Sequence, residues 1–470
     1  MRAVLVACFL LLTQAVGTLA QAAAPQFRES YVAGTGDSAG QFMGGTELMN
    51  IVAHQGKLYA GVGYWEDAAG RDVRPGAQIV VRDAPMAPWR VDHSFPGTVR
   101  VDSLRSFTFR TDGRGRRVAP ASLLLTAPGN AINGDASVWS RDDATGVWTA
   151  MVIARLGPRA RGQIRALGFH HDPVTGVDEV FAGAGVQSGS AIGIFHGVYD
   201  PTALGRIRWD STPEFTDYEG RPTAFAEANG VLYVTCFRAM YRRVDGPAPS
   251  WVRVFFYDHP LLPNNSGLRG LTAIPNPSGT GQALLVALEG RAGRVYRIDP
   301  ASNYKAVVEL DIVDFLRRQW KTQSPLYVIT AYNDMPTVTA PRSGPTVRLL
   351  GLQAHDPQPG RETSAWYLVR HSDASYELHE IHAIPGSKRS NPALVAVRTI
   401  AVSPFPADAG GVVYFGGYDC NSKPAHDTAW MYEADVTDVF GRARPPQGSR
   451  LGDEEPSPLG HVAPGPKVPQ

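Results

Sequence analysis

The stretch Asp142-Asp-Ala-Thr-Gly-Val-Trp148 contains the most informative pattern of the chain. A turn opens with Asp at the end of one strand-like run, and an aromatic residue stands in the next run. The pattern recurs in five further segments: Asp83 to Trp89, Asp200 to Trp209, Asp245 to Trp251, Asp299 to Tyr304 and Asp373 to Tyr376. An Asp side chain accepts backbone N–H bonds in a tight turn, and an aromatic ring packs a broad face between sheets. The recurrence indicates a repeated architecture rather than a particular chemistry.

Seven apolar runs mark the centres of the repeats. They are residues 57–60, 122–125, 179–182, 231–234, 283–286, 347–350 and 412–415. Four strand-like runs per repeat and no convincing helix inside a repeat predict an all-β, seven-bladed β-propeller of four-stranded blades. The seventh repeat lacks its outer strand. We therefore expect residues 26–33 to pair with the run 429–434 and to close the ring.

The ends of the chain differ in composition from its middle. Arg2 and the apolar run 3–12, followed by small residues, have the layout of a secretory signal peptide over residues 1–22. Residues 26–436 are predicted to form one propeller domain, with a helical insertion near 312–320. The Pro/Gly-rich residues 437–470 are predicted to be a disordered tail. A leader of this kind predicts a secreted or periplasmic protein.

The charge balance gives no reason to expect a nucleic-acid partner, and the cysteines leave a disulfide open. The chain has 45 Lys+Arg against 44 Asp+Glu, a formal net charge of +1, which does not call for nucleic acid. No segment after the leader is apolar enough to cross a membrane, and we expect a monomer. Cys236 and Cys420 remain once the leader is removed. They could form a disulfide in an oxidising compartment or stay as two buried thiols.

Arginine opens the first strand in five of the seven repeats. These residues are Arg105, Arg165, Arg221, Arg269 and Arg398. If their side chains converge on a central cavity, they form a ring of rigid donor forks that suit carboxylate, sulfate or phosphate. The alternative is that each Arg pairs with a neighbouring blade. Glu47 stands at this position in the first blade and would be a partner or an acid/base.

Long polar loops between the second and third strands fall in blades one, six and seven, which are neighbours in a closed ring. They supply Tyr64, Trp65, His355, Tyr418, Asp419, His426 and Asp427. Tyr332 precedes the first strand of the sixth blade. These residue types suffice for acid–base catalysis or for a carbohydrate platform. The alternative is that the loops simply vary in length.

Metal sites have little support in the sequence. His170-His171 belongs to a hairpin on the opposite face, and no Cys/His spacing matches a zinc site. The polar loop 130–135 could hold calcium, and no other cofactor is predicted.

The pair Gly416-Gly417, which follows a strand-like run and precedes an aromatic residue, resembles the kelch type of β-propeller. The resemblance covers residues 45–435 at the level of architecture and implies a fold, not an activity. Some kelch-type propellers are copper-radical oxidases, which implies a weaker alternative function. The available parts for it are Cys236, Cys420, Tyr418 and His426.

Two classes of function stay open at this point, and the sequence does not decide whether the protein is an enzyme. The first is a binding protein whose long-loop face and central cavity take a glycan, another anionic ligand or an envelope protein. The second is a lyase that acts on a uronate polysaccharide. In that reading Arg398 and Arg269 neutralise the carboxylate, while Tyr418 or Tyr332 acts with His426 as acid and base.

Overall fold

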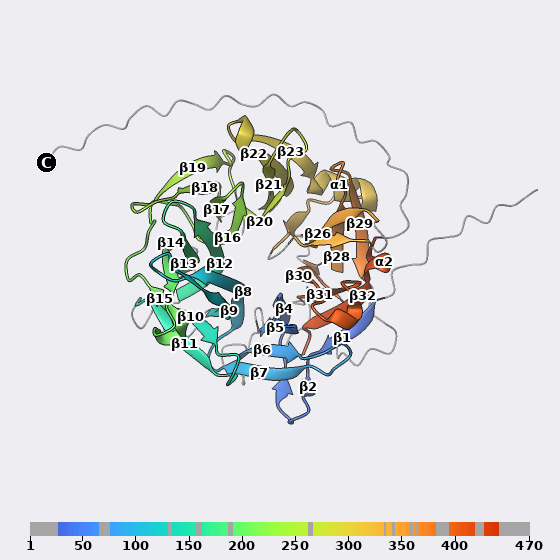
Figure 1. The fold of residues 1–470 in the computed structure, drawn as a ribbon. Coiled ribbons are helices and arrows are strands. Elements are labelled where there is room, and N and C mark those ends of the chain that lie inside the picture. The colour runs from blue at the N-terminus through green and yellow to red at the C-terminus, as the bar shows by residue number, and fades with distance from the viewer. Residues whose placement is uncertain are drawn as a thin grey trace, which may run out of the picture.

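Seven antiparallel sheets form a ring, and the first strand of each sheet lies nearest the axis (Figure 1). The computed structural model describes residues 27–64, 76–129, 134–156, 162–186, 191–261, 267–332, 335–340, 344–356, 361–362, 365–381, 394–418 and 427–440. The predicted seven-bladed propeller is confirmed, and all seven apolar runs fall on second strands.

The first four blades follow in chain order from inner to outer strand. Blade 1 comprises β4 (Glu47–His54), β5 (Lys57–Gly63), β6 (Ala77–Arg82) and β7 (Arg90–Phe95). Blade 2 comprises β8 (Arg100–Thr111), β9 (Arg117–Gly129), β10 (Ala136–Arg141) and β11 (Trp148–Ala154). Blade 3 comprises β12 (Gly162–Asp172), β13 (Val177–Val186), β14 (Ala191–Tyr199) and β15 (Ile207–Trp209), with η1 (Leu204–Arg206) before β15. Blade 4 comprises β16 (Pro222–Ala228), β17 (Val231–Cys236), β18 (Ala239–Val244) and β19 (Ser250–Phe256).

The last three blades carry the additions to the repeat. Blade 5 comprises β20 (Gly267–Pro275), β21 (Gln282–Glu289), β22 (Arg294–Asp299) and β23 (Lys305–Asp311), with η2 (Pro300–Ser302) before β23. Helix α1 (Ile312–Trp320) follows, where an insertion is expected. Blade 6 has a divided inner strand, β24 (Tyr327–Thr330) and β25 (Thr337–Thr339), then β26 (Thr346–Asp356), β27 (Arg361–Glu362), β28 (Ala365–Arg370) and β29 (Tyr376–Ile381). Blade 7 comprises β30 (Val397–Val402), η3 (Pro406–Asp408), β31 (Val412–Gly417) and β32 (Trp430–Asp435), followed by α2 (Val436–Val439).

The N-terminal strand closes the ring. Strand β1 (Arg28–Val32) pairs antiparallel with β32, which confirms the predicted closure. Its Tyr31 is buried and donates from its hydroxyl to Gly44 O at 2.8 Å. The short hairpin β2 (Thr35–Gly36) and β3 (Phe42–Met43) then leads into blade 1. Strands from the two ends of the chain therefore share one blade.

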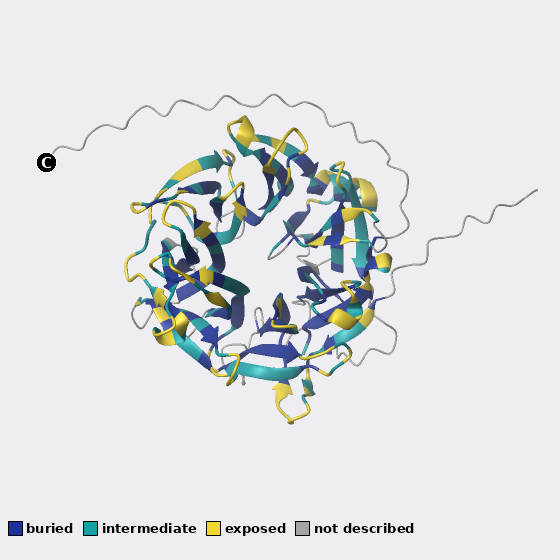
Figure 2. Ribbon diagram, in the orientation of Figure 1, coloured by how far each residue is buried: buried dark blue, intermediate teal, exposed yellow. Residues whose placement is uncertain are grey.

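Each pair of neighbouring sheets encloses its own cluster of buried apolar side chains. Second strands are apolar on both faces because a blade lies on either side, and β21 is buried over seven of its eight residues. Burial is deepest in the inner and middle strands, while exposed residues gather at the rim (Figure 2). In blade 7, a side chain at Gly417 would collide with the Trp430 ring, since a Cβ there would lie 1.7 Å from a ring carbon.

The Asp-turn-aromatic repeat joins one blade to the next. The Asp142 carboxylate accepts from two backbone N–H groups of its turn, as expected. Trp148 Nε1 reaches Asp92 in the preceding blade at 2.8 Å, and Arg141 binds the same carboxylate at 2.9 and 3.0 Å. The sequence pattern indicates the aromatic residue but not the Arg that precedes the turn.

Three other blades repeat this clamp, in which an Arg of the third strand and a downstream aromatic residue bind a polar group of the preceding blade. The sets are Arg243 and Trp251 on Glu214, Arg370 and Tyr376 on Glu309, and Arg82 on Glu433 with Trp89 on Ser30. The repeat therefore supplies charge-assisted hydrogen bonds between blades as well as turns within them.

Candidate anion-binding site at the centre of the ring

Most inner strands carry a β-bulge near their first residues. The register skips Met49, Asp102, Arg165, Thr223 and Arg398, and in blade 5 it skips Arg269 together with Gly270. A bulged residue is left out of the ladder, and the strand bends around it, so its side chain is re-aimed. Three of the five predicted arginines, Arg165, Arg269 and Arg398, stand at such bulges.

The register corrects the expected position of Arg105. In blade 2 the bulge holds Asp102, and Arg105 lies three residues further along β8, where its Nη1 donates to Leu104 O at 3.1 Å. Arg221 stands two residues before the bulge of its blade, which is the position of Arg100 in blade 2 and of Glu47 in blade 1. The strand pattern alone could not reveal this offset, because a bulge adds a residue without changing the apolar run.

Tyr332 lies at the centre of the arginine set. The sequence predicted it before the first strand of blade 6, whereas β24 ends at Thr330 and Tyr332 lies in the break between β24 and β25. Ala331 has a φ of 49°, which turns the chain out of the strand. The guanidinium carbons of Arg398, Arg269 and Arg165 lie 4.5, 5.3 and 5.7 Å from the Tyr332 ring centroid. Arg165 Nη1 also donates to the Tyr332 hydroxyl.

Three carboxylates balance part of the positive charge. Arg100 lies 2.5 Å from Asp102 and 3.7 Å from Glu47, so Glu47 is an ion-pair partner. Arg269 pairs with Glu289, whose other oxygen accepts from Tyr327 at 2.7 Å. Burial lowers the pKa of Arg100 and Arg269, but the carboxylates outweigh it and hold both pKa values above the ordinary one. These two arginines are therefore internally compensated.

Arg398 and Arg221 are not compensated in this way. The Arg398 guanidinium is buried and lies close to two aromatic rings, 4.5 Å from the Tyr332 centroid and 4.4 Å from the Tyr418 centroid. Its Nε and Nη1 have no hydrogen-bond partner among the described residues. Arg221 donates to Gln163 at 3.2 Å, and burial together with the charge of Arg269 lowers its pKa to about 10. The described part of the site holds five guanidinium groups and three carboxylates, so an anion would be stabilised there.

The other predicted residues fall into three groups. Tyr418 forms an isolated bridge with Glu47, and Asp427 forms one with Gly45, so the ends of the blade 7 loop meet the start of blade 1. Tyr64 is buried. The His355 ring stacks on the Tyr327 ring with centroids 4.8 Å apart, and the Tyr327 hydroxyl donates to Glu289. Trp65, Asp419, Cys420 and His426 lie outside the described residues, as do 130–133 of the calcium candidate.

Arg100, Asp102 and Glu289 are site residues that the sequence analysis missed. Arg100 and Asp102 stand at alternate positions of a strand start that is otherwise apolar or small, and both are buried. Buried charged residues need partners, so this spacing was a usable signal. Glu289 ends an apolar second strand and gave no comparable sign.

Among the described residues, no group of three or more His, Cys, Asp or Glu side chains is arranged to hold a metal ion. Cys236 is a buried free thiol, so the described structure gives no support to a Cys236–Cys420 bridge. In the same part of the chain, no helix is long and apolar enough to cross a membrane.

Comparison with known proteins assigns no family. No family model matches the chain, and no curated protein matches it. A GH74 enzyme of Niastella koreensis has a TM-score of 0.45 at 12% identity over 85% of this chain, which spans 55% of that enzyme. The Dos1 propeller has a TM-score of 0.40 at 12% identity, covering 86% of this chain and 82% of its own. The α-L-arabinofuranosidase Arb93A of Fusarium graminearum has a TM-score of 0.39 at 10% identity, covering 88% and 98%.

Proposed function

We propose that this chain is an exported β-propeller that binds an anionic glycan, one with carboxylate groups, at the centre of its ring. The observation that carries the proposal is the Arg398 guanidinium, which is buried and has two nitrogens without a hydrogen-bond partner in the described part of the chain. A buried charge without a counter-charge is costly. Such a group is expected where a ligand supplies the missing partner.

The neighbours of Arg398 favour a carboxylate on a sugar ring over a bare ion. A guanidinium fork matches the two oxygens of a carboxylate. The centroids of the Tyr332 and Tyr418 rings lie 4.5 and 4.4 Å from the guanidinium carbon, and an aromatic ring suits the C–H face of a pyranose. A uronate residue presents both features at once, whereas sulfate and phosphate present only the charge.

A thermal-shift panel tests the proposal. The purified protein is heated with oligogalacturonate, with alginate oligomers, with sulfate and with phosphate, each at matched ionic strength. A ligand that binds the folded state raises the Tm with its concentration, and we expect the uronate oligomers to do so more strongly than the simple ions. The proposal is wrong if no uronate oligomer raises the Tm.

A uronate lyase is the second candidate, and the position of Tyr332 favours it. Its hydroxyl accepts a hydrogen bond from Arg165, and three guanidinium groups surround its ring. In a lyase, Arg398 and Arg269 would neutralise the uronate carboxylate, which makes the C5 proton easier to remove. A base takes that proton, the C4–O bond breaks, a C4–C5 double bond forms, and the leaving oxygen takes up a proton. Tyr332 would be the acid or the base in this step.

Absorbance of the unsaturated product separates the two candidates. The protein is incubated with a panel of uronate polysaccharides and the absorbance is followed over time. A lyase gives a rising signal that Tyr332→Phe abolishes while the uronate-induced rise in Tm persists. If no polysaccharide gives the product, the lyase candidate is discarded and the binding function stands alone.

A further inference from the structure

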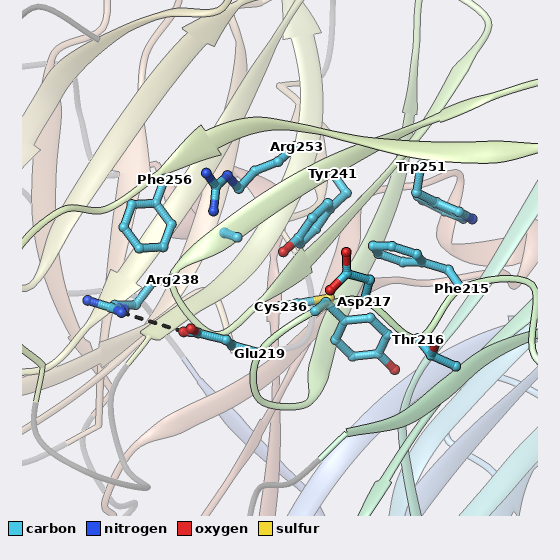
Figure 3. A pocket seen from close by; sticks show the side chains of 12 residues that line it. Phe215, Thr216, Asp217, Glu219, Cys236, Arg238, Tyr241, Trp251, Arg253 and Phe256 are labelled. Atoms are coloured by element: carbon cyan, nitrogen blue, oxygen red, sulfur yellow. Dashed lines mark hydrogen bonds and ion pairs between the residues drawn. The ribbon is translucent and has the colours of Figure 1, made fainter. Parts of the chain in front are cut away.

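A pocket lies over the fourth blade, near its outer strand, and none of the central arginines lines it (Figure 3). Its volume is about 530 Å³, within the range of about 300–1,000 Å³ that is usual for small-molecule sites. The pocket is lined by the segment 215–219, by Cys236 at the end of β17 and Arg238 in the turn after it, and by residues of β18 and β19. The pocket thus belongs to the end of the ring where inner strands begin, as does the central arginine set.

Aromatic side chains make up much of the wall. Phe215 stacks on Trp251 with ring centroids 5.7 Å apart and an angle of 15° between the planes. Tyr241 and Tyr218 contact the same Phe215 ring at 5.0 and 5.2 Å. Burial, and next the Cys236 thiol, raise the pKa of the Tyr241 phenol. Tyr241 therefore keeps its proton at neutral pH and can donate a hydrogen bond from the wall.

Four charged side chains occupy the rim, two of each sign (Figure 3). Arg238 and Arg253 lie 4.8 and 5.0 Å from the ring of Phe256, on the outer strand. Asp217 and Glu219 belong to the facing wall, and Glu219 lies 3.5 Å from Arg238. Because the two carboxylates offset the two guanidinium groups, this rim favours neither an anion nor a cation.

We propose that this pocket binds an uncharged saccharide unit. A neutral sugar carries hydroxyl groups that both donate and accept hydrogen bonds, which matches a rim of paired carboxylates and guanidinium groups. It also has an apolar C–H face, which matches an aromatic wall. Ligands with a net charge gain less from this rim, and purely apolar ligands leave its charges unsatisfied.

The pocket also lies close to the central site along the chain. Glu219 on its rim and Arg221 in the arginine set are two residues apart, so their Cα atoms are at most about 7 Å apart. A glycan that holds a uronate at the centre could place a neutral unit here; this extension, unlike the pocket itself, rests on the proposed function.

Titration calorimetry with neutral oligosaccharides tests the pocket. The probes are cello-, xylo-, malto- and arabino-oligosaccharides, applied to the full protein and to two variants of exposed rim residues, Asp217→Ala and Arg253→Ala. We expect at least one probe to bind and each variant to weaken it about tenfold or more, because a hydrogen bond to a charged group is lost. Arg117→Ala, an exposed arginine of β9 at the opposite end of the ring, is the matched control and should bind as the wild type does.

Two results would overturn the assignment: no neutral oligosaccharide binds at millimolar concentration, or binding survives both rim variants unchanged. A third variant, Arg398→Met, keeps this test separate from that of the central site. It should weaken uronate binding at least about tenfold and leave neutral-oligosaccharide binding intact. Loss of uronate binding together with retained neutral binding therefore supports both sites, and retained uronate binding counts against the central site alone.

Discussion

Arg398 is a buried charged residue whose guanidinium lacks, within the described part of the chain, hydrogen-bond partners that buried charges normally have. It is 7% exposed, and neither its Nε nor its Nη1 has a hydrogen-bond partner in the described residues. Arg370 is 6% exposed but binds both oxygens of Glu309, at 2.6 and 2.8 Å. The two arginines are equally buried and differ in whether a carboxylate compensates them. Their comparison sets an arginine with an internal carboxylate partner against the one that the proposed function assigns to a ligand.

We therefore expect opposite effects when each arginine is replaced by an apolar side chain of similar length. Arg398→Met should leave the free energy of unfolding unchanged or raise it by about 1 kcal/mol, because an uncompensated buried charge is removed. Arg370→Met should lower it by about 2 kcal/mol, because buried Glu309 loses both short bonds to Arg370 and keeps, among the described residues, only the Tyr376 hydroxyl at 2.8 Å and Arg297 at 3.4 Å. Urea unfolding followed by circular dichroism measures both values. A large loss of stability in Arg398→Met would mean that this residue is structural.

At the scale of the element, the clamps between blades are the devices that the repeat encodes. In the second blade, Arg141 and Trp148 both bind Asp92 of the first blade. We expect Asp92→Asn to lower the free energy of unfolding by about 2 kcal/mol, because buried Arg141 loses its two-pronged partner and keeps, in the described structure, only Asp143, at 2.9 Å, as a counter-charge. The double variant Asp92→Asn/Arg141→Met should recover part of that loss. Additive losses in this double-mutant cycle would contradict a direct coupling.

The clamp between the third and fourth blades, in which Arg243 contacts several carboxylates, makes the stability of the fold depend on pH. Burial raises the pKa of Glu179 from 4.5 to about 7, Arg243 opposes the rise, and Glu214 and Asp172 add to it. The unfolded chain loses this proton near pH 4.5 and the folded chain keeps it until about pH 7, so stability falls as pH rises through that window. Between about pH 5 and about pH 8, Glu179→Gln should lose less stability than the wild type, by on the order of 2 kcal/mol. Urea unfolding at both pH values checks this, and identical pH profiles would refute it.

At the scale of the whole molecule, the ring is held shut by β1. It completes blade 7, and Ser30 binds both Arg82 and Trp89 of blade 1. Deleting residues 1–33 should therefore lower the Tm sharply and broaden the transition, because the seventh sheet loses a strand and blade 1 loses part of its clamp. The predicted disordered tail spans residues 437–470, but its first residues belong to α2 and include the buried Phe440, so the control deletes 441–470 alone and should leave the Tm unchanged. Differential scanning calorimetry measures the Tm of both deletion variants. An unchanged Tm after deletion of residues 1–33 would contradict closure by β1.

The fold was more predictable from sequence than the site, for a physical reason. Strands and turns are set by local patterns, so the seven apolar runs and the Asp turns were sufficient to count the blades. The arginine set depends on β-bulges and on a divided strand, which change where a side chain points without changing the pattern of apolar residues. Arg105 and Asp102 lie on one strand, and only the register assigns the bulge to Asp102. Arg165, Arg269 and Arg398 were found because their Arg recurs with the repeat.

The central claim is that Arg398 binds the carboxylate of a glycan. Titration calorimetry of a uronate oligomer against the wild type, Arg398→Met and Arg117→Met tests it most directly. We expect the wild type and Arg117→Met to bind alike, and Arg398→Met to bind at least about tenfold more weakly, since a charge-assisted pair is lost. Equal affinity in all three proteins, or no binding by the wild type, would contradict the claim.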